Sequence, residues 1–303
     1  MIDNFNMKGD NIMEKILLDT DIGCDIDDAM CLTYLLNNPN CDLLGITTVT
    51  DNVYRRAMLA SAICKKAGRN IPIYMGAEKP LIVPHRDAYP QQSDRLDLWE
   101  HQTAFPDLHA VEFMRKTIFE NPNEITLLAI GPLTNIALLF ALYPQVPAML
   151  KGLYIMGGKF LGAPQLEWNI KYDPHAAAIV YAANIKEIYT VGLDVTMLLT
   201  MNKETAAEAF SGENLNILSV LADDWYKDIS NSIIFHDPLA ISILFERDIC
   251  TYKKGKIEIV LDESSDIFSC TKFTEDSSGR HYIADTVDNN KFFNNFMSTL
   301  KSE

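Results

Sequence analysis

The chain has 303 residues, 48% of them hydrophobic, enough for one large α/β domain or two smaller ones with a sizeable core. Its formal net charge of −15 argues against nucleic acid and anionic membrane surfaces as partners. No apolar stretch approaches the length of a membrane span, and the N-terminus lacks the apolar core of a signal peptide. We therefore expect a cytoplasmic protein whose six scattered cysteines are free thiols.

Residues 1–12 are polar and predict a disordered N-terminal extension, whereas residues 13–303 predict a single domain. Strand-like and helix-like segments then alternate over the first two thirds of the chain. The strands are expected at Lys15–Asp19, Asp42–Val49, Ile71–Met75, Glu124–Ile130, Gly152–Met156 and Glu187–Leu193. The helices are expected at Asp28–Leu36, Val53–Lys66, Leu108–Glu120, Leu133–Leu142, Pro174–Ala183 and Leu239–Phe245. This alternation predicts an α/β fold with a doubly wound, mostly parallel sheet.

The chain changes character near its end. Three short segments, Lys256–Leu261, Ile267–Phe273 and His281–Val287, predict a small C-terminal antiparallel addition, and a final helix is expected at Asn289–Leu300. Earlier, the polar stretch Pro80–Phe105 is long for a connection in a compact domain, which makes it a candidate mobile lid.

Five aspartates crowd the end of the first predicted strand: Asp19, Asp21, Asp25, Asp27 and Asp28. Like charges this close repel each other, and a bound cation is the simplest way to turn the repulsion into attraction. Oxygen ligands alone favour Ca²⁺ or Mg²⁺ over zinc. Helix capping by Asp27 or Asp28 is the simpler alternative, but it explains only two of the five acids.

Cys24 lies inside this acidic loop. It could be read as a nucleophile, but no histidine is near it in sequence to activate the thiol, so we prefer a small residue filling a tight turn. Cys31, in the following helix, is expected in the core.

Other polar side chains stand at the ends of predicted strands or just before helices. They are Asn52, the pair Glu167 and Asn169, and the pair His236 and Asp237. In a doubly wound sheet these loops can converge on one edge. Each also has a simpler explanation, as a helix cap, a structural histidine or an ordinary loop residue, and Trp168 between Glu167 and Asn169 is expected to pack.

Taken together, these residues and their neighbours make the chain resemble the nucleoside hydrolase family. The resemblance rests on six short motifs in family order between about residues 15 and 245. They are the Asp-rich loop (Asp19–Gly23, then Asp27-Asp28), Thr47-Thr48-Val49 with Asn52, the segment Leu128–Ala137, Ile155–Gly158, Glu167–Asn169 and His236–Ala240. Each motif alone is weak, whereas the ordered set is specific. The resemblance implies a Rossmann-like core and a calcium-dependent N-ribohydrolase that cleaves a purine or pyrimidine ribonucleoside into ribose and free base.

The same resemblance implies a metal site and two catalytic groups. Calcium (Ca²⁺) would be bound by Asp21, Asp28, the backbone carbonyl of Ile130 and Asp237. Asp21 would also be the general base toward the attacking water, and His236 the acid that assists the leaving base. An imidazole suits that task because its ordinary pKa lies near neutrality.

Further residues would contact the substrate. The ribose hydroxyls would meet Asp27, Asn52 and Asn169, with Glu167 on the 5′-hydroxyl side and Met156 under the sugar. Trp225 and Tyr226 could stack on the nucleobase, or could simply form the packing face of a helix. The family also suggests a homodimer or homotetramer.

The chain departs from the family pattern in three places. The Asp-rich loop is two residues longer, so Asp25 could replace Asp27 in its role, although we favour Asp27-Asp28 as the matching pair. The loop between Met156 and Glu167 is shorter and has no counterpart of an asparagine that contacts the 5′-hydroxyl. The segment 84–101 lacks the usual His-Gly pattern, although it contains His85 and His101.

Two other classes of protein compete with the hydrolase. A haloacid dehalogenase-like phosphatase also places two aspartates after its first strand and uses Mg²⁺, but it would leave His236-Asp237-Pro238 unexplained. A catalytically silent nucleoside- or sugar-binding protein on the same scaffold would bind ligand and calcium without turnover.

Overall fold

The computed structural model describes residues 13–301. The predicted N-terminal extension, residues 1–12, lies outside the described residues. Nine strands form one sheet in the order β10-β9-β11-β6-β5-β4-β1-β2-β3. They are β1 (Glu14–Thr20), β2 (Cys41–Thr48), β3 (Ile73–Met75), β4 (Ile125–Ala129), β5 (Gly152–Met156), β6 (Ile188–Val191), β9 (Cys250–Ile259), β10 (Thr271–Glu275) and β11 (His281–Val287). β7 (Thr200–Met201) and β8 (Ile233–Ile234) form a separate two-stranded pair.

The predicted mostly parallel sheet is confirmed. β1 pairs in parallel with both β2 and β4. The chain adds β2 and β3 on one side of β1 and then crosses to the other side with β4, so the order of strand addition reverses at β1. Ligands of open α/β sheets bind outside the carboxyl ends of the strands at such a point. The Asp-rich loop follows β1 and therefore begins at the switch point.

The C-terminal strands join this sheet. β9 is antiparallel to both β10 and β11, as the predicted antiparallel addition requires. The predicted antiparallel addition is therefore confirmed, and β11 also pairs in parallel with β6 at His281↔Ile188, which joins the addition to the main sheet. β11 returns to the open edge of β6 in the direction of the main sheet.

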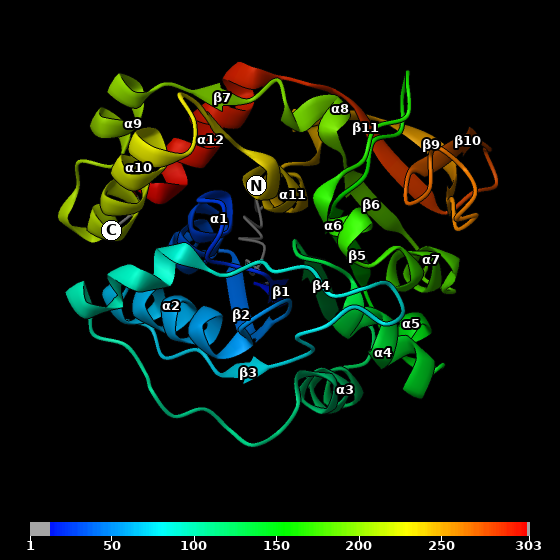
Figure 1. Cartoon of the computed structure of the whole chain (residues 1–303), viewed down its shortest axis with the longest axis horizontal. Helices are drawn as coiled ribbons and strands as arrows, with labels where there is room; N and C mark the ends of the chain where they lie inside the picture. The colour runs from blue at the N-terminus through cyan, green and yellow to red at the C-terminus, as the bar shows by residue number, and fades with distance from the viewer. Residues whose placement is uncertain (1–12, 302–303) are drawn as a thin grey trace, which may run out of the picture.

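Helices cover both faces of the sheet. They are α1 (Asp27–Asn37), α2 (Val53–Lys66), α3 (Ala110–Glu120), α4 (Thr134–Leu142), α5 (Val146–Met149), α6 (Trp168–Tyr172), α7 (Pro174–Ala182), α8 (Leu193–Thr196), α9 (Lys203–Ala209), α10 (Asn216–Asp228), α11 (His236–Phe245) and α12 (Asn289–Leu300), with 3-10 helices η1 (Gln91–Leu98), η2 (Glu213–Leu215) and η3 (Arg247–Ile249). In Figure 1, α11 and α12 lie on one side of the strands and α3, α4 and α5 on the other.

Alternation along β1 separates two hydrophobic clusters. Ile16 and Leu18 pack in the cluster that contains residues of α1, α2, α11 and α12. Leu17 packs in the other, with residues of α3, α4 and α7. Neighbouring side chains of a strand point to opposite faces, so a continuous apolar strand fills both layers. None of the helices between residues 13 and 301 has the length and apolar character needed to span a membrane.

Two stretches differ from expectation. The predicted lid contains the 3-10 helix η1, and a short helix, α6, begins at Trp168, where a loop was expected.

The predicted helix start at Asp173 is confirmed, because its carboxylate accepts a hydrogen bond from the Ala176 backbone N–H at 3.0 Å. The alternative roles of Asp27 and Asp237 as helix caps are wrong, since both lie inside the first turn of their helices.

Candidate active site

A cavity of about 370 Å³ opens at the carboxyl ends of the central strands. Most residues predicted from the sequence line it: Asp21, Asp27, Asp28, Ile130, Met156, Glu167, Asn169, Trp225, His236 and Asp237. Asn52 and Tyr226 are not among its lining residues. Asp25, the alternative to Asp27 considered from the sequence, also lines it. Six further lining residues were not assigned a role in it from the sequence: Cys24, Gln91, Leu166, Trp168, Leu193 and Ile229.

Three carboxylates form the centre of the site. Oxygens of Asp27, Asp28 and Asp237 lie within 4.8 Å of one another, and all three side chains are buried. The Thr20 hydroxyl donates a hydrogen bond to Asp28, and the Asp237 backbone N–H donates one to Asp27 Oδ2 at 3.2 Å. The helix α11 thus brings Asp237 to a loop more than 200 residues earlier in the chain.

These three groups destabilise one another when they are ionised. Burial is the largest cause that raises the pKa of each well above its ordinary value, and repulsion from neighbouring carboxylates adds to it. An oxygen-only donor set of this kind fits calcium, which takes carboxylate and carbonyl oxygens. A cation here would compensate the buried negative charge.

Asp21 lies on the same cavity, outside this group of three. Burial raises the pKa of its carboxyl, while the charge of Arg56 and a hydrogen bond from the Trp168 side chain act in the opposite direction. Trp168 packs against Tyr172, with ring centroids 5.9 Å apart, as expected, but it is also 43% exposed and lines the cavity.

Arg56 fixes the backbone of the acidic loop through hydrogen bonds to its carbonyl groups. Its side chain is fully buried, and its guanidinium donates to the carbonyls of Asp21, Ile22 (3.0 Å), Asp51 (2.8 Å) and Ala88. The sequence contained no signal for this role, because a helix arginine ordinarily faces solvent. Burying the cation among carbonyls ties the Asp-rich loop to the predicted lid.

The lid segment also touches the acidic loop directly. Gln91 and Gln92 donate their side-chain amides to the carbonyls of Cys24 (2.9 Å) and Asp25 (2.8 Å). Gly23 has φ +127°, and a Cβ there would lie 2.5 Å from Pro90 Cβ. Only glycine permits this close approach, so the lid segment and loop pack as one unit.

Asn169 lies in the first turn of α6, and Glu167 is the N-cap of this helix. The Glu167 carboxylate accepts the backbone N–H groups of Asn169 (2.9 Å) and Ile170 (3.1 Å) of the helix, and also that of Gly158 (2.9 Å) after β5. Asn169 donates its amide to the Ile130 carbonyl at 2.8 Å and to the Met156 carbonyl at 3.2 Å. This leaves the Asn169 amide oxygen and a second lone pair of the Ile130 carbonyl for a ligand.

His236 begins α11, and its Nδ1 lies 2.8 Å from the Thr196 hydroxyl. Burial lowers its pKa to about 4, so the ring is neutral at neutral pH. Burial thus moves the ring away from the ordinary imidazole pKa that made His236 the expected acid.

The remaining predicted residues have these places. Asn52 stands before α2 with φ 61°, and its side chain makes no capping hydrogen bond. Trp225 donates its indole N–H to the Ser232 carbonyl at 2.9 Å, whereas Tyr226 donates its hydroxyl to the Met201 carbonyl at 2.7 Å. Of the two aromatic residues, only Trp225 reaches the cavity.

All six cysteines are free thiols, as predicted. Cys24 lies between the acidic loop and the lid segment, and burial raises the pKa of its thiol to about 11. A protonated thiol is a poor nucleophile, which agrees with a packing role. Cys31 is fully buried in the core.

Comparisons with known proteins agree with this architecture. Residues 16–294 match the inosine-uridine preferring nucleoside hydrolase family. A probable uridine nucleosidase 2 of Oryza sativa subsp. japonica is 31% identical over 273 residues, which is 81% of this chain and 78% of that protein. The non-specific ribonucleoside hydrolase RihC of Salmonella newport is 38% identical over 190 residues, or 60% of this chain and 61% of its own.

Solved structures show the same fold. A plant nucleoside hydrolase, the PpNRh1 enzyme, superposes with a TM-score of 0.83 at 23% identity, covering 96% of this chain and 99% of that chain. A purine-preferring ribonucleoside hydrolase from Gardnerella vaginalis gives 0.81 at 22% identity, covering 94% and 98%.

Proposed function

The chain belongs to the inosine-uridine preferring nucleoside hydrolase family, and we propose that it is a calcium-dependent N-ribohydrolase that splits a ribonucleoside into ribose and free base. The family membership favours a nucleoside hydrolase over the phosphatase considered from the sequence. One observation supports the proposal most strongly. The three clustered carboxylates, Asp21 and His236 face a single cavity at the switch point of the sheet.

The proposed calcium ligands are Asp21, Asp28, Asp237 and the Ile130 carbonyl, and Asp27 lies in the same carboxylate group as two of them. Bound calcium would orient the sugar diol and make an attacking water more acidic. The donor set consists of oxygen atoms only, which supports calcium over zinc.

Asp21 is the proposed general base. Its carboxylate accepts the proton of the water that attacks the anomeric carbon, and the charge of Arg56 favours the ionised form. Arg56 also donates a hydrogen bond to the Asp21 backbone carbonyl, which fixes the loop that carries this side chain. Breaking the N-glycosidic bond places positive charge on the ribosyl ring. The surrounding carboxylates stabilise that charge more than they stabilise the neutral substrate, so they lower the barrier.

The substrate would be held by the other lining residues. Asp27 and the Asn169 amide oxygen can hydrogen-bond the ribose hydroxyls, Met156 can pack under the sugar, and Trp225 can stack on the base. Asn52 and the 5′-hydroxyl role of Glu167 stay predictions from the family resemblance, as do the homodimer or homotetramer and the cytoplasmic location.

His236 would assist departure of the base as a neutral imidazole. With a pKa lowered to about 4, it is not an imidazolium at neutral pH, so its proposed contribution is a hydrogen bond donated to the leaving base. This bond would matter most for bases that leave poorly.

The decisive experiment measures release of reducing sugar from a panel of purine and pyrimidine ribonucleosides, with calcium and after chelation. Release that stops on chelation and returns with calcium supports the proposal. Tight binding of nucleoside without release would instead identify a silent binding protein, and calcium-independent turnover would refute the metal assignment.

A further inference from the structure

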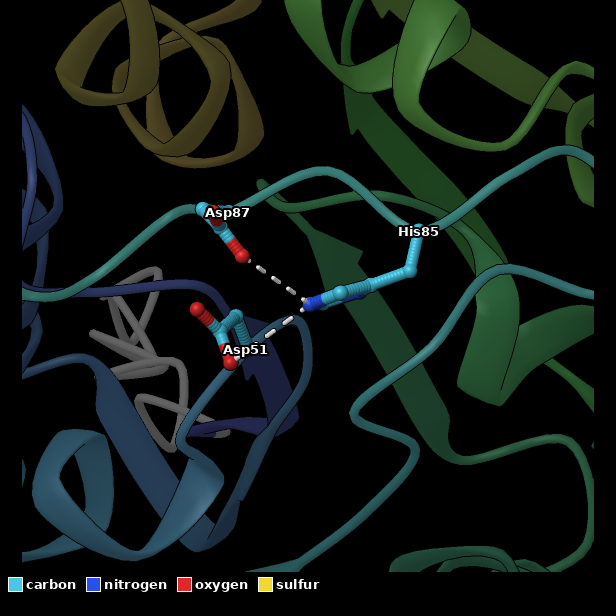
Figure 2. A group of neighbouring side chains, drawn as sticks. All are labelled: Asp51, His85 and Asp87. Atoms are coloured by element: carbon cyan, nitrogen blue, oxygen red, sulfur yellow. Dashed lines mark ion pairs between the residues drawn. The ribbon is translucent and has the colours of Figure 1, made fainter.

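A second group of metal-ligating side chains lies on the lid segment, away from the carboxylates of the cavity. Figure 2 shows the His85 ring pointing between the carboxylates of Asp51 and Asp87. His85 and Asp87 come from the lid segment, and Asp51 comes from the loop after β2. We call these three residues the lid cluster.

The spacing in the lid cluster is that of ligands around one ion. His85 Nε2 lies 3.8 Å from Asp51 Oδ1 and 3.8 Å from Asp87 Oδ1, too far for a hydrogen bond to either carboxylate. Two atoms that each bind zinc at about 2.1 Å are at most about 4.2 Å apart. One ligand atom from each of the three residues lies within 4.8 Å of the others.

The surroundings hold two of the ligands in place. His85 Nδ1 lies 3.4 Å from the Tyr172 hydroxyl, which donates its own proton to the Glu78 carbonyl at 3.0 Å. Nδ1–H can therefore donate to Tyr172, which directs the Nε2 lone pair toward the two carboxylates. Asp51 Oδ2 accepts the Ala88 backbone N–H at 3.2 Å, which leaves Oδ1 on the His85 side.

We propose that the lid cluster binds a divalent transition-metal ion, best matched by Zn²⁺, which attaches the lid segment to the loop after β2. One imidazole and two carboxylates suit zinc, and three protein ligands leave a position for water. The Asp87 side chain is exposed, so it is free to rotate and bring its carboxylate into the coordination distance of the ion. This site is separate in residues and in donor chemistry from the buried group of Asp27, Asp28 and Asp237.

Metal binding at the lid cluster would restrict the motion of the cavity wall, because the two are joined by a short stretch of chain. The lid segment continues from Asp87 to Gln91, which lines the cavity. Ala88 accepts a hydrogen bond from Arg56, the residue that also holds Asp21 and Ile22. The zinc ion would therefore restrict one wall of the cavity without contacting substrate.

The test is a zinc titration of the untagged full chain by calorimetry, in saturating calcium so that the cavity carboxylates do not compete. The wild type is expected to bind one more equivalent of zinc than His85→Ala. Asp87→Asn is expected to weaken that equivalent at least tenfold, and it changes a fully exposed side chain that packs against no core residue. Tyr172→Phe, which removes the partner of Nδ1, is expected to weaken it about tenfold.

His101→Ala is the matched control, because His101 is the other histidine of the lid segment and its Nδ1 contacts only the Trp99 carbonyl among the hydrogen bonds described. It should retain the full zinc stoichiometry. Equal stoichiometry in the wild type and His85→Ala, or loss in His101→Ala alone, would overturn the proposal. So would the absence of zinc binding to the wild type, which would leave the lid cluster an ion pair.

A second readout reports on the lid itself. Trypsin cleaves after Arg86, an exposed residue between two of the proposed ligands. Zinc should slow this cleavage at least severalfold in the wild type and in His101→Ala, but not in His85→Ala. Cleavage unaffected by bound zinc would show that the ion does not restrict the lid segment.

Discussion

At the carboxyl end of the sheet, six carboxylates line one cavity, and burial raises the pKa of each. His281, buried at the opposite end, has a partner for both ring nitrogens. His281 Nδ1 accepts the Ile257 backbone N–H at 2.7 Å, and Nε2 lies 3.0 Å from the Tyr181 carbonyl. The hollow beside His281 is the larger of the two, at about 770 Å³. Size alone therefore does not identify the site.

The difference lies in how the buried polar groups are satisfied. Burial lowers the pKa of both His236 and His281 to about 4, so both rings are neutral. Both ring nitrogens of His281 contact backbone groups, which links β11 to β9 and α7. His236 instead lines a cavity that carboxylates surround. Buried carboxylates that repel one another around the cavity distinguish the functional end, and the following experiments test this distinction.

The largest effect is expected for Asp21→Asn. The amide cannot accept the proton of the attacking water, so kcat should fall by at least about 10³-fold while the melting temperature stays close to that of the wild type. Ribose release and thermal denaturation measure the two quantities. A nearly intact rate would refute the role of Asp21 as base, and Asp25→Asn serves to compare the neighbouring acid of the lengthened loop.

His236→Ala should have a smaller effect that depends on the leaving base. Losing one hydrogen bond to the departing base should cost purine nucleosides about 10²-fold in kcat, and nucleosides with better leaving groups less. Because the pKa of His236 is about 4, its titration should contribute no change in rate between pH 6 and 8. Equal losses for all bases would instead indicate that His236 positions Asp237.

Calcium should stabilise the fold through the clustered carboxylates. At calcium 100-fold above Kd, binding to the native state alone adds about 2.7 kcal/mol, which a thermal scan with and without chelator detects. Asp237→Asn should lose this response. After chelation at pH 8 the variant should be more stable than the wild type, because one of three repelling charges is gone.

An apo Asp237→Asn protein that is less stable than the apo wild type would contradict the repulsion. Calcium affinity should also depend on pH because of these carboxylates. Ionised carboxylates bind calcium and protonated ones do not, so the affinity should rise with pH.

The smallest effect is expected at the opposite end of the sheet. The folded pKa of His281, about 4, lies below its unfolded value, so the folded state binds fewer protons and its stability falls as pH drops below about 6.5. Between pH 7 and 5 this amounts to about 2 kcal/mol. Urea denaturation of His281→Gln should show a pH slope reduced by that amount, and an unchanged slope would mean that His281 does not titrate differently on unfolding.

The local features of this protein were predictable from sequence alone. The six strands from β1 to β6 begin and end within two residues of their predicted positions, and Asp173 caps α7 as predicted. Apolar periodicity and turn residues act between near neighbours in the chain, so they are readable without the fold. The ordered motifs likewise identified most of the residues that line the cavity.

Tertiary structure decided what depends on distant segments. Whether β11 runs parallel to β6, and whether Trp225 or Tyr226 reaches the cavity, follows from packing between elements far apart in sequence. Arg56 acquires its role only when four backbone carbonyls surround it. The lowered pKa of His236 is a consequence of burial, which no spacing of residues reveals, and burial is decided by the whole chain.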